Sequence, residues 1–200
     1  NTLVLDEADR MLDMGFIRDI RKIISVLPRT NRQNLLFSAT YSNQIRSLSR
    51  EILNNPKNIQ IAKENTSADT INQIVYSVDK KSRRKLLIKL IKDKDIQQLL
   101  VFTRTKRAAN TLSEKLVESG LEAKALHSNK SQNCRMRTLE SFKNNETRVL
   151  VATDVMARGI DISQLPYVVN FDLPQAPTDY LHRIGRTGRA GKTGCRRASR

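Results

Sequence analysis

Residues 3–9 read Leu-Val-Leu-Asp-Glu-Ala-Asp, so three apolar residues run directly into a segment with three carboxylates. This order is typical of a buried parallel strand that ends at the carboxyl edge of a sheet, where open α/β folds bind their ligands. Asp6, the first acid after the apolar run, is suited to hold Mg²⁺ through a water molecule. Glu7 can reach the same phosphates from another side, as a base or as an orienter of an attacking water. The alternative is an acidic turn that caps a helix over residues 10–14, since Asp is common near a helix start.

Outward from this segment, apolar residues alternate between helical spacing and short continuous runs. In the first 62 residues, the pattern after the opening strand predicts a helix over 17–27 that Pro28 ends, a strand over 34–40, a helix over 45–53 and a short strand over 58–61. The strand over 34–40 ends in Ser-Ala-Thr, so here too a short apolar run leads into polar residues. Farther along, the predicted strands are 73–78, 99–102, 123–126, 149–152 and 167–171, and the predicted helices are 83–91, 106–119, 132–143 and one from about 178 onward.

This alternation predicts right-handed βαβ crossovers on mainly parallel sheets, which is the α/β fold class. Residues 63–72 are polar and lack helical periodicity, so we interpret them as a linker. The chain then consists of a partial α/β unit at 1–62, with only three candidate strands, and a larger unit at 73–194. Residues 195–200, Cys-Arg-Arg-Ala-Ser-Arg, are expected to be an atypical basic tail, because this composition is not typical of a buried strand.

The chain carries a large excess of positive charge. Of its 200 residues, 36 are Lys or Arg and 20 are Asp or Glu, which gives a formal net charge of +16. Such an excess favours a polyanionic partner, with nucleic acid ahead of a membrane surface, although part of it must simply solvate helix faces. No apolar run approaches the length of a membrane span. Cys134 and Cys195 match no metal spacing and are expected to be free thiols in a reducing cytoplasm.

Two segments of the larger unit carry residues suited to phosphate chemistry. A hydroxyl, two carboxylates, an arginine and a glycine lie within residues 153–161, after an apolar run, although strand-to-loop turns are often polar anyway. In residues 180–191, arginines recur at 183, 186 and 189 and alternate with glycines. Three crowded guanidinium groups repel one another unless an anion lies among them, and arginine binds phosphate oxygens with two parallel hydrogen bonds. The alternative, a solvated basic helix end, does not require glycine at such regular intervals.

Taken together, these segments resemble the motifs of the DEAD-box RNA helicases. Residues 6–9, Asp-Glu-Ala-Asp, match the tetrad that names the family, and residues 38–40, Ser-Ala-Thr, resemble the motif that couples its two domains. The family's later motifs are matched in their usual order by residues 101–105, Gln132 with Arg135, residues 152–162 and residues 182–191. The sequence around these motifs is most similar to that of the bacterial RhlE-like subgroup. The resemblance implies two RecA-like parallel-sheet domains, the first only partly present, that close over ATP, Mg²⁺ and single-stranded RNA.

The resemblance also implies a role for each matching residue. The residues implied in catalysis are Asp6, Glu7, Arg186 and Arg189. The two acids would handle Mg²⁺ and the attacking water, and the two arginines would contact the γ-phosphate as arginine fingers. The residues implied in coupling the domains are Ser38, Thr40 and Asp9, the last through contacts across the cleft, and those implied at the nucleotide are Asp161, His182 and Arg183. The residues implied at the RNA sugar–phosphate backbone, where contacts are weakly sequence-selective and salt-dependent, are Thr103, Arg104, Gln132, Arg135, Thr153 and Gly159.

The sequence also departs from the family's pattern. The Gly-rich phosphate-binding loop with Lys and Ser or Thr has no counterpart here, nor do the adenine-reading motif and the RNA motifs of the first domain. Because the chain starts at Asn1, directly at the first strand and without an initiator Met, we expect a piece of a longer protein. Because the phosphate-binding loop is missing, we expect this piece to be inactive alone. After Gly194 the family continues into an apolar strand, where this sequence has the basic tail. A truncation or a frame slip would explain that difference.

Two other functions stay open at this point. The chain can act as a non-enzymatic RNA-binding fragment, or it can derive from a DNA-directed helicase of the same superfamily. The Asp-Glu-Ala-Asp sequence of residues 6–9 disfavours the DNA-directed alternative. Competition between RNA and DNA of one sequence distinguishes the two through the 2′-hydroxyl group.

Overall fold

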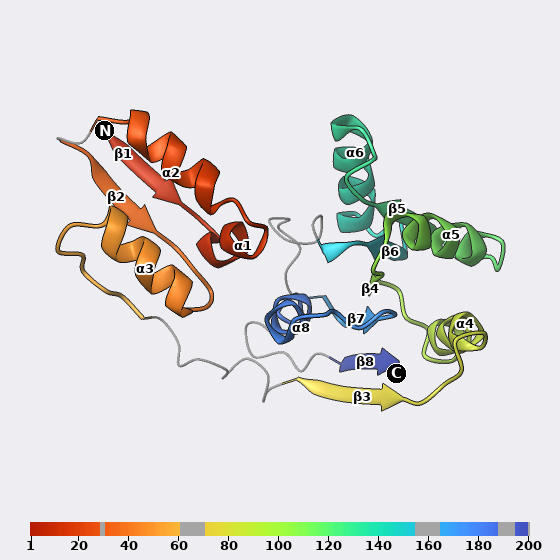
Figure 1. Ribbon diagram of the computed structural model, residues 1–200. Coiled ribbons are helices and arrows are strands. Elements are labelled where there is room, and N and C mark those ends of the chain that lie inside the picture. The colour runs from red at the N-terminus through yellow and green to blue at the C-terminus, as the bar shows by residue number, and fades with distance from the viewer. Residues whose placement is uncertain (29–30, 61–70, 155–164, 188–194, 200) are drawn as a thin grey trace. The chain divides into compact units, whose positions relative to one another are not determined.

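A computed structural model describes residues 1–28, 31–60, 71–154, 165–187 and 195–199 of the chain. The chain divides into two compact units, residues 1–64 and residues 65–200, and each unit has its own hydrophobic core. Both units combine parallel strands with helices (Figure 1), which confirms the predicted α/β class.

Within the described residues, the first unit contains a pair of parallel strands and three helices. In chain order its elements are β1 (Thr2–Leu5), α1 (Ala8–Asp13), α2 (Ile17–Val26), β2 (Gln33–Leu36) and α3 (Asn43–Ile52). The two strands are in register, with Leu5 opposite Leu36 at their carboxyl ends. α3 begins after Ser42, whose side chain accepts a hydrogen bond from the backbone N–H of Ile45 and so satisfies a free donor of the first turn.

The predictions overestimated strand formation and burial in the first unit. Residues 58–60 lie in no strand and Ile59 is 72% exposed, so the strand predicted over 58–61 is wrong over its described part. β1 is not buried along its length, because Val4 is 52% exposed. An apolar run is buried only where structure covers both faces of the strand. The buried cluster of this unit consists of Leu5, Ala8, Leu12, Ile20, Ile45, Leu48 and Ile52.

The second unit is organised around a parallel sheet of six described strands. They are β3 (Asn72–Tyr76), β4 (Leu99–Phe102), β5 (Ala123–Leu126), β6 (Val149–Ala152), β7 (Tyr167–Asn170) and β8 (Cys195–Ser199), in the spatial order β3-β8-β7-β4-β6-β5. The described helices of this unit are α4 (Arg83–Asp93), α5 (Lys106–Val117), α6 (Gln132–Lys143) and α8 (Pro177–Ile184). Apart from β8, the predicted elements of this unit match these bounds to within two residues.

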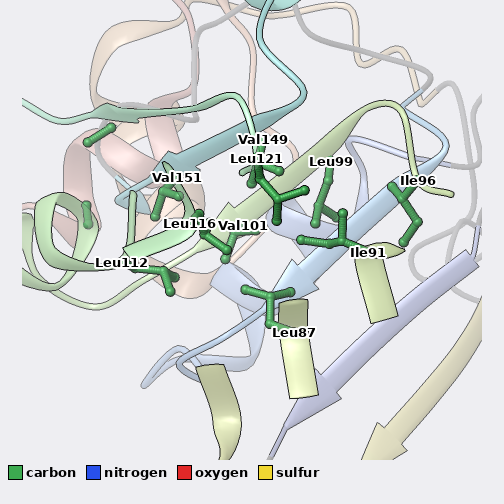
Figure 2. Close-up of a cluster of buried hydrophobic side chains, with 12 residues drawn as sticks. Leu87, Ile91, Ile96, Leu99, Val101, Leu112, Leu116, Leu121, Val149 and Val151 are labelled. Carbon is green, nitrogen blue, oxygen red and sulfur yellow. The ribbon is translucent and has the colours of Figure 1, made fainter. Parts of the chain in front are cut away.

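β4 and β6 lie inside this sheet and are buried at every position. Successive side chains of a strand point to opposite faces, so these two strands contribute to two separate clusters. Leu99, Val101, Val149 and Val151 pack with side chains of α4 and α5 on one face (Figure 2). The alternate residues pack with Phe142 of α6 in the other cluster. Because both faces are covered, these strands are continuous apolar runs that the sequence predicts well.

The expected basic tail is part of the sheet. The backbone of β8 pairs in parallel with β3 on one side and with β7 on the other, so the prediction of a tail outside the sheet is wrong for residues 195–199. A ladder joins backbone N–H and C=O groups, which every residue except proline supplies, so a basic composition does not exclude a strand. The second unit also begins before residue 73, because Ile71 is buried and Asn72 starts β3. Residues 63–70 of the predicted linker lie outside the described residues.

Candidate functional site

The acidic residues of the opening segment lie where β1 ends. Asp6 is exposed, and its Oδ1 accepts a hydrogen bond from the backbone N–H of Glu7 at 2.9 Å. Glu7 has a left-handed backbone conformation, with φ of 50°, and its Oε2 lies 3.2 Å from Nη1 of Arg10. A non-glycine residue in this conformation costs about 1–3 kcal/mol, and such residues cluster at functional sites. The exposed carboxylate of Asp6 fits a Mg²⁺ ion that keeps most of its waters.

The structure brings the three predicted coupling residues together inside the first unit. Asp9 is 5% exposed, and its Oδ2 accepts hydrogen bonds from the backbone N–H and from Oγ1 of Thr40, each at 2.9 Å. Oγ of Ser38 donates to the backbone oxygen of Thr40 at 2.6 Å. These bonds fasten the loop after β2 to the start of α1. The contact lies within one unit, whereas the resemblance implied that Asp9 reaches later motifs across a cleft.

Asp9→Ala should loosen this loop. The substitution leaves the N–H and hydroxyl groups of Thr40 without their acceptor, which costs about 1–3 kcal/mol of the free energy of unfolding. We expect the amide of Thr40 to exchange faster with solvent, as measured by hydrogen-exchange NMR. The control is Asp13→Ala, which removes an exposed carboxylate from the same helix. Equal effects of the two substitutions would show that the Asp9–Thr40 contact contributes nothing specific.

In the second unit, four strands end level with one another at one edge of the sheet. The register partners at their carboxyl ends are Phe102, Leu126, Ala152 and Asn170. Two predicted RNA contacts, Thr103 and Thr153, directly follow the adjacent strands β4 and β6. Both are buried, at 0% and 7% exposed. Their side chains therefore shape the loops at this edge, and their neighbours supply its exposed surface.

That exposed surface is basic. Arg104 is exposed, and its backbone N–H donates to Oδ2 of Asp172 at 3.0 Å, which fixes the loop after β4. Gln132 and Arg135 lie near the start of α6, and Nη2 of Arg135 donates to Oε1 of Gln132. The start of a helix favours anions, because its backbone N–H groups and the positive end of its dipole point outward there. This arrangement suits the phosphate groups of a polyanion.

A histidine that the sequence patterns did not single out lies at the same edge. His127 follows β5, is 2% exposed, and has its Nε2 at 2.9 Å from Oδ1 of Asn110 on α5. Burial lowers the pKa of His127, and the charges of Lys130 and Lys106 lower it further, so the imidazole is neutral at pH 7. The rule that selected Thr153, a polar residue directly after an apolar strand, would also have found His127.

Arg183 of α8 is held by acceptors at the ends of two strands of the second unit. It is 3% exposed, and its Nη2 donates to Oδ2 of Asp154 at 2.7 Å. Its Nη1 donates to Oδ1 of Asn170 at 2.9 Å and to the carbonyl oxygen of Asp172 at 2.6 Å. The resemblance implied a nucleotide contact for Arg183. Its described hydrogen bonds all lie within the second unit, where Asp154 and Asp172 are partly exposed and Asn170 is buried, and the nucleotide contact stays a prediction.

The remaining nucleotide-side residues are described in part. His182 lies in α8, Arg186 follows the helix, and both are half-buried. The carbonyl oxygen of Arg186 accepts a hydrogen bond from the backbone N–H of Leu165 at 3.0 Å. The described residues hold no group of three His, Cys, Asp or Glu side chains placed to bind a metal. The predicted site residues that lie outside the described residues are Gly159, Asp161 and Arg189.

Cys134, near the start of α6, is an exposed free thiol, as expected. Among the helices that the structure describes, none combines the length and the apolar character needed to cross a membrane.

The predicted site residues divide between the units, with Asp6, Glu7, Asp9, Ser38 and Thr40 in the first and all others in the second.

Two family models match the chain. Residues 1–48 match the DEAD/DEAH box helicase model, and residues 82–191 match the helicase conserved C-terminal domain. The ATP-dependent RNA helicase RhlB of Pseudomonas syringae pv. tomato is 44% identical over 193 residues, which cover 96% of this chain and 49% of the relative. The DEAD-box ATP-dependent RNA helicase CshA of Geobacillus kaustophilus is 45% identical over 194 residues, which cover 97% of this chain and 41% of the relative. The chain thus spans about half the length of these curated relatives, or less.

Solved structures show the same likeness. Dbp5 of S. cerevisiae bound to RNA and ADP BeF3 is 33% identical, with a TM-score of 0.87, and the match covers 100% of this chain and 53% of that one. A DEAD box protein from the hyperthermophile Methanococcus jannaschii is 41% identical, with a TM-score of 0.63 and the same coverage. These matches confirm the RecA-like architecture. The similar relatives carry the names RhlB and CshA, so the RhlE-like subgroup stays a prediction.

Proposed function

This chain belongs to the DEAD-box helicase family, and we propose that the protein couples ATP hydrolysis to the separation of short RNA duplexes or the remodelling of RNA–protein complexes. It would act in the cytoplasm. The observation that carries the proposal is the edge of the second unit's sheet, where exposed Arg104 stands beside Thr103 and Thr153 at the ends of parallel strands. Open α/β sheets bind ligands at such ends. Exposed arginine and the start of α6 suit a sugar–phosphate backbone, and the related Dbp5 was solved with RNA.

The residues of the first unit would act on the nucleotide. Mg²⁺, when bound, would neutralise charge on the phosphates, and Asp6 would hold it through water. Glu7 would orient the attacking water, and its carboxylate is paired with the guanidinium of Arg10. Closure of the two units would bring Arg186 and Arg189 to the γ-phosphate, and the loop of Ser38, Thr40 and Asp9 would respond to that closure. Phosphoryl transfer depends mainly on such positioning and charge.

No segment of the 200 residues matches the phosphate-binding pattern of Gly, four residues, then Gly-Lys and Ser or Thr, because the Gly-Lys-Thr run at residues 191–193 has Arg186 where the first Gly would stand. We therefore propose that this chain alone binds RNA without hydrolysing ATP. The test compares ATP hydrolysis by this chain with hydrolysis by a version extended on its N-terminal side to the length of its relatives, called the full-length protein below. RNA-stimulated hydrolysis by the full-length protein alone supports the proposal. If neither protein hydrolysed ATP, a non-enzymatic RNA-binding function would remain. If DNA of the same sequence competed as well as RNA, RNA as the substrate would be contradicted.

RNA binding by this chain should be weak, nearly independent of sequence and strongly reduced by salt. Arg104→Ala and Arg135→Ala should each weaken binding and reduce the slope of log affinity against log salt by about one, because each removes a phosphate contact. Fluorescence anisotropy of labelled single strands at several salt concentrations measures both quantities.

The matched control is Lys92→Ala, which removes an exposed positive charge from the last turn of α4, just before the amino end of β4. It should leave the salt slope nearly unchanged. If all three substitutions reduced the slope equally, net charge rather than the edge of the sheet would determine binding. Binding that is insensitive to salt and selective for sequence would instead indicate base recognition.

A further inference from the structure

Exposed positive charges gather at the start of α4. Lys80 and Lys81 precede the helix, Arg84 and Lys85 lie in its first turn, and all four residues are exposed. We call these four residues the α4 cluster. Asp79 directly precedes them, and the next acidic residue lies in the last turn of the helix. Within the part of the chain that the structure describes, none of the four side chains forms an ion pair.

The α4 cluster lies at the end of the helix where positive charge is least favourable. The backbone N–H groups give the start of a helix a partial positive charge, which repels cations and favours anions. The first turn of α4 contains no acidic residue, and the side chain of Ser82 at the N-cap makes no capping hydrogen bond. Residues that break such a local rule without a compensating contact inside the fold indicate a function. A bound anion would remove the repulsion.

The strand before α4 ends at the edge of the sheet that carries the proposed RNA contacts. Val75 of β3 and Asn170 of β7 both lie opposite Ala198 of β8, so β3 and β7 end level to within one residue. The chain leaves β3 at this edge and leads directly into α4 (Figure 1). The α4 cluster therefore begins at the same edge as the loop after β4.

One carboxylate connects the start of α4 with that loop. Oδ1 of Asp172 lies 3.7 Å from Nη1 of Arg83, the first residue of the helix. Oδ2 of the same residue accepts the backbone N–H of Arg104 at 3.0 Å. The exposed side chain of Arg104 and the α4 cluster thus lie on either side of a single acidic group. A polyanion bound at Arg104 can continue onto α4 without crossing a negatively charged surface.

We propose that the α4 cluster is a second binding site for the sugar–phosphate backbone, which holds the part of a single-stranded RNA that extends beyond Arg104. Exposed Lys and Arg side chains bind phosphate groups without reading the bases, so this site would not select a sequence. The inference rests on the proposed function and extends the RNA path along one more helix. It predicts that the chain binds longer strands more tightly for a reason that can be localised.

The experiment measures binding of labelled oligouridylates of about four to about twenty nucleotides to the 200-residue chain, by fluorescence anisotropy at several salt concentrations. The variant is the double substitution Lys81→Ala/Arg84→Ala. For the longest strands it should reduce the slope of log affinity against log salt by about two, because each lost phosphate contact contributes roughly 0.7–0.9. For the shortest strand that binds, the slope should stay unchanged.

The matched control is Lys89→Ala/Lys92→Ala, which removes the same charge from exposed positions in later turns of α4. This control should change the slope for no strand length. The thermal midpoint of Lys81→Ala/Arg84→Ala should not fall, since removing cations from a helix start relieves repulsion. A purely structural role for the cluster would lower the thermal midpoint. Equal loss of affinity by both double variants at every length, or no loss by either, overturns the inference.

Arg104→Ala separates failure of this inference from failure of the proposed function. It should weaken binding of every strand, including the shortest. If Arg104→Ala does so while Lys81→Ala/Arg84→Ala shows no dependence on strand length, the inference alone is overturned. If Arg104→Ala leaves the binding of all strands unchanged, or if the chain binds no RNA, the proposed RNA edge is overturned and the inference with it.

Discussion

Arg186→Ala should lower the RNA-stimulated turnover of ATP by the full-length protein by about 10³-fold or more, because an arginine finger contributes roughly 10³–10⁵ to the rate. RNA affinity measured without ATP should stay almost unchanged, since a finger acts only when the units close on the nucleotide. The hydrogen bond from Leu165 to the carbonyl of Arg186 holds the backbone at this turn, so the substitution removes the side chain without freeing the loop. Arg186→Lys should not restore turnover, because a point charge cannot reproduce a planar, two-pronged contact.

The control for this prediction is Arg104→Ala, which should give the opposite order of effects. Its RNA affinity should fall first, and its turnover should recover at saturating RNA, because the lost contact belongs to RNA binding alone. Measuring both quantities on both variants separates a finger from a basic patch. Unchanged turnover of Arg186→Ala at saturating ATP and RNA would falsify the finger assignment.

The two units differ in how well the sequence predicted them. β4 and β6 are buried on both faces, so their apolar runs are continuous and their bounds were predicted correctly. The strand predicted at 58–61 alternates polar and apolar residues, Asn-Ile-Gln-Ile, and Ile59 is 72% exposed and lies in no strand. β8 shows the reverse case, since its pairing with two neighbours uses the backbone and leaves no signal in residue type.

In the candidate site, the contacts between side chains were likewise not predictable from the sequence. Spacing predicted a row of arginines facing an anion, but it could not tell which of them turns inward, because the acceptors of Arg183 lie just after β6 and on β7, 29 and 13 residues away in the chain. The pairing of Asp9 with Thr40 depends likewise on β1 and β2 lying side by side. Strand ends were predictable because parallel strands bring them to one edge. Which side chains contact one another across that edge can be known only from the fold.

Hydrogen exchange of this chain should show that the second unit is the more stable one. The amides of β4 and β6 should exchange roughly 10²–10³-fold more slowly than those of β1 and β2, because core strands open only with the whole unit, whereas weakly covered elements open locally. β4 has a strand neighbour on each side and is buried throughout. β1 pairs only with β2 among the described residues, and Val4 at its centre is 52% exposed.

β5 provides the internal control for this comparison, because it lies at an edge of the larger sheet and pairs only with β6 among the described strands. If edge position alone set the exchange rate, β5 would exchange as fast as β1. If the stability of the unit sets it, β5 should resemble β6, since Leu126 is fully buried and Ala125 nearly so, in the clusters shared with β4 and β6. Protection of β1 and β2 equal to that of β6 would contradict the prediction and show that the single cluster around Ile45 and Leu48 suffices to hold the first unit.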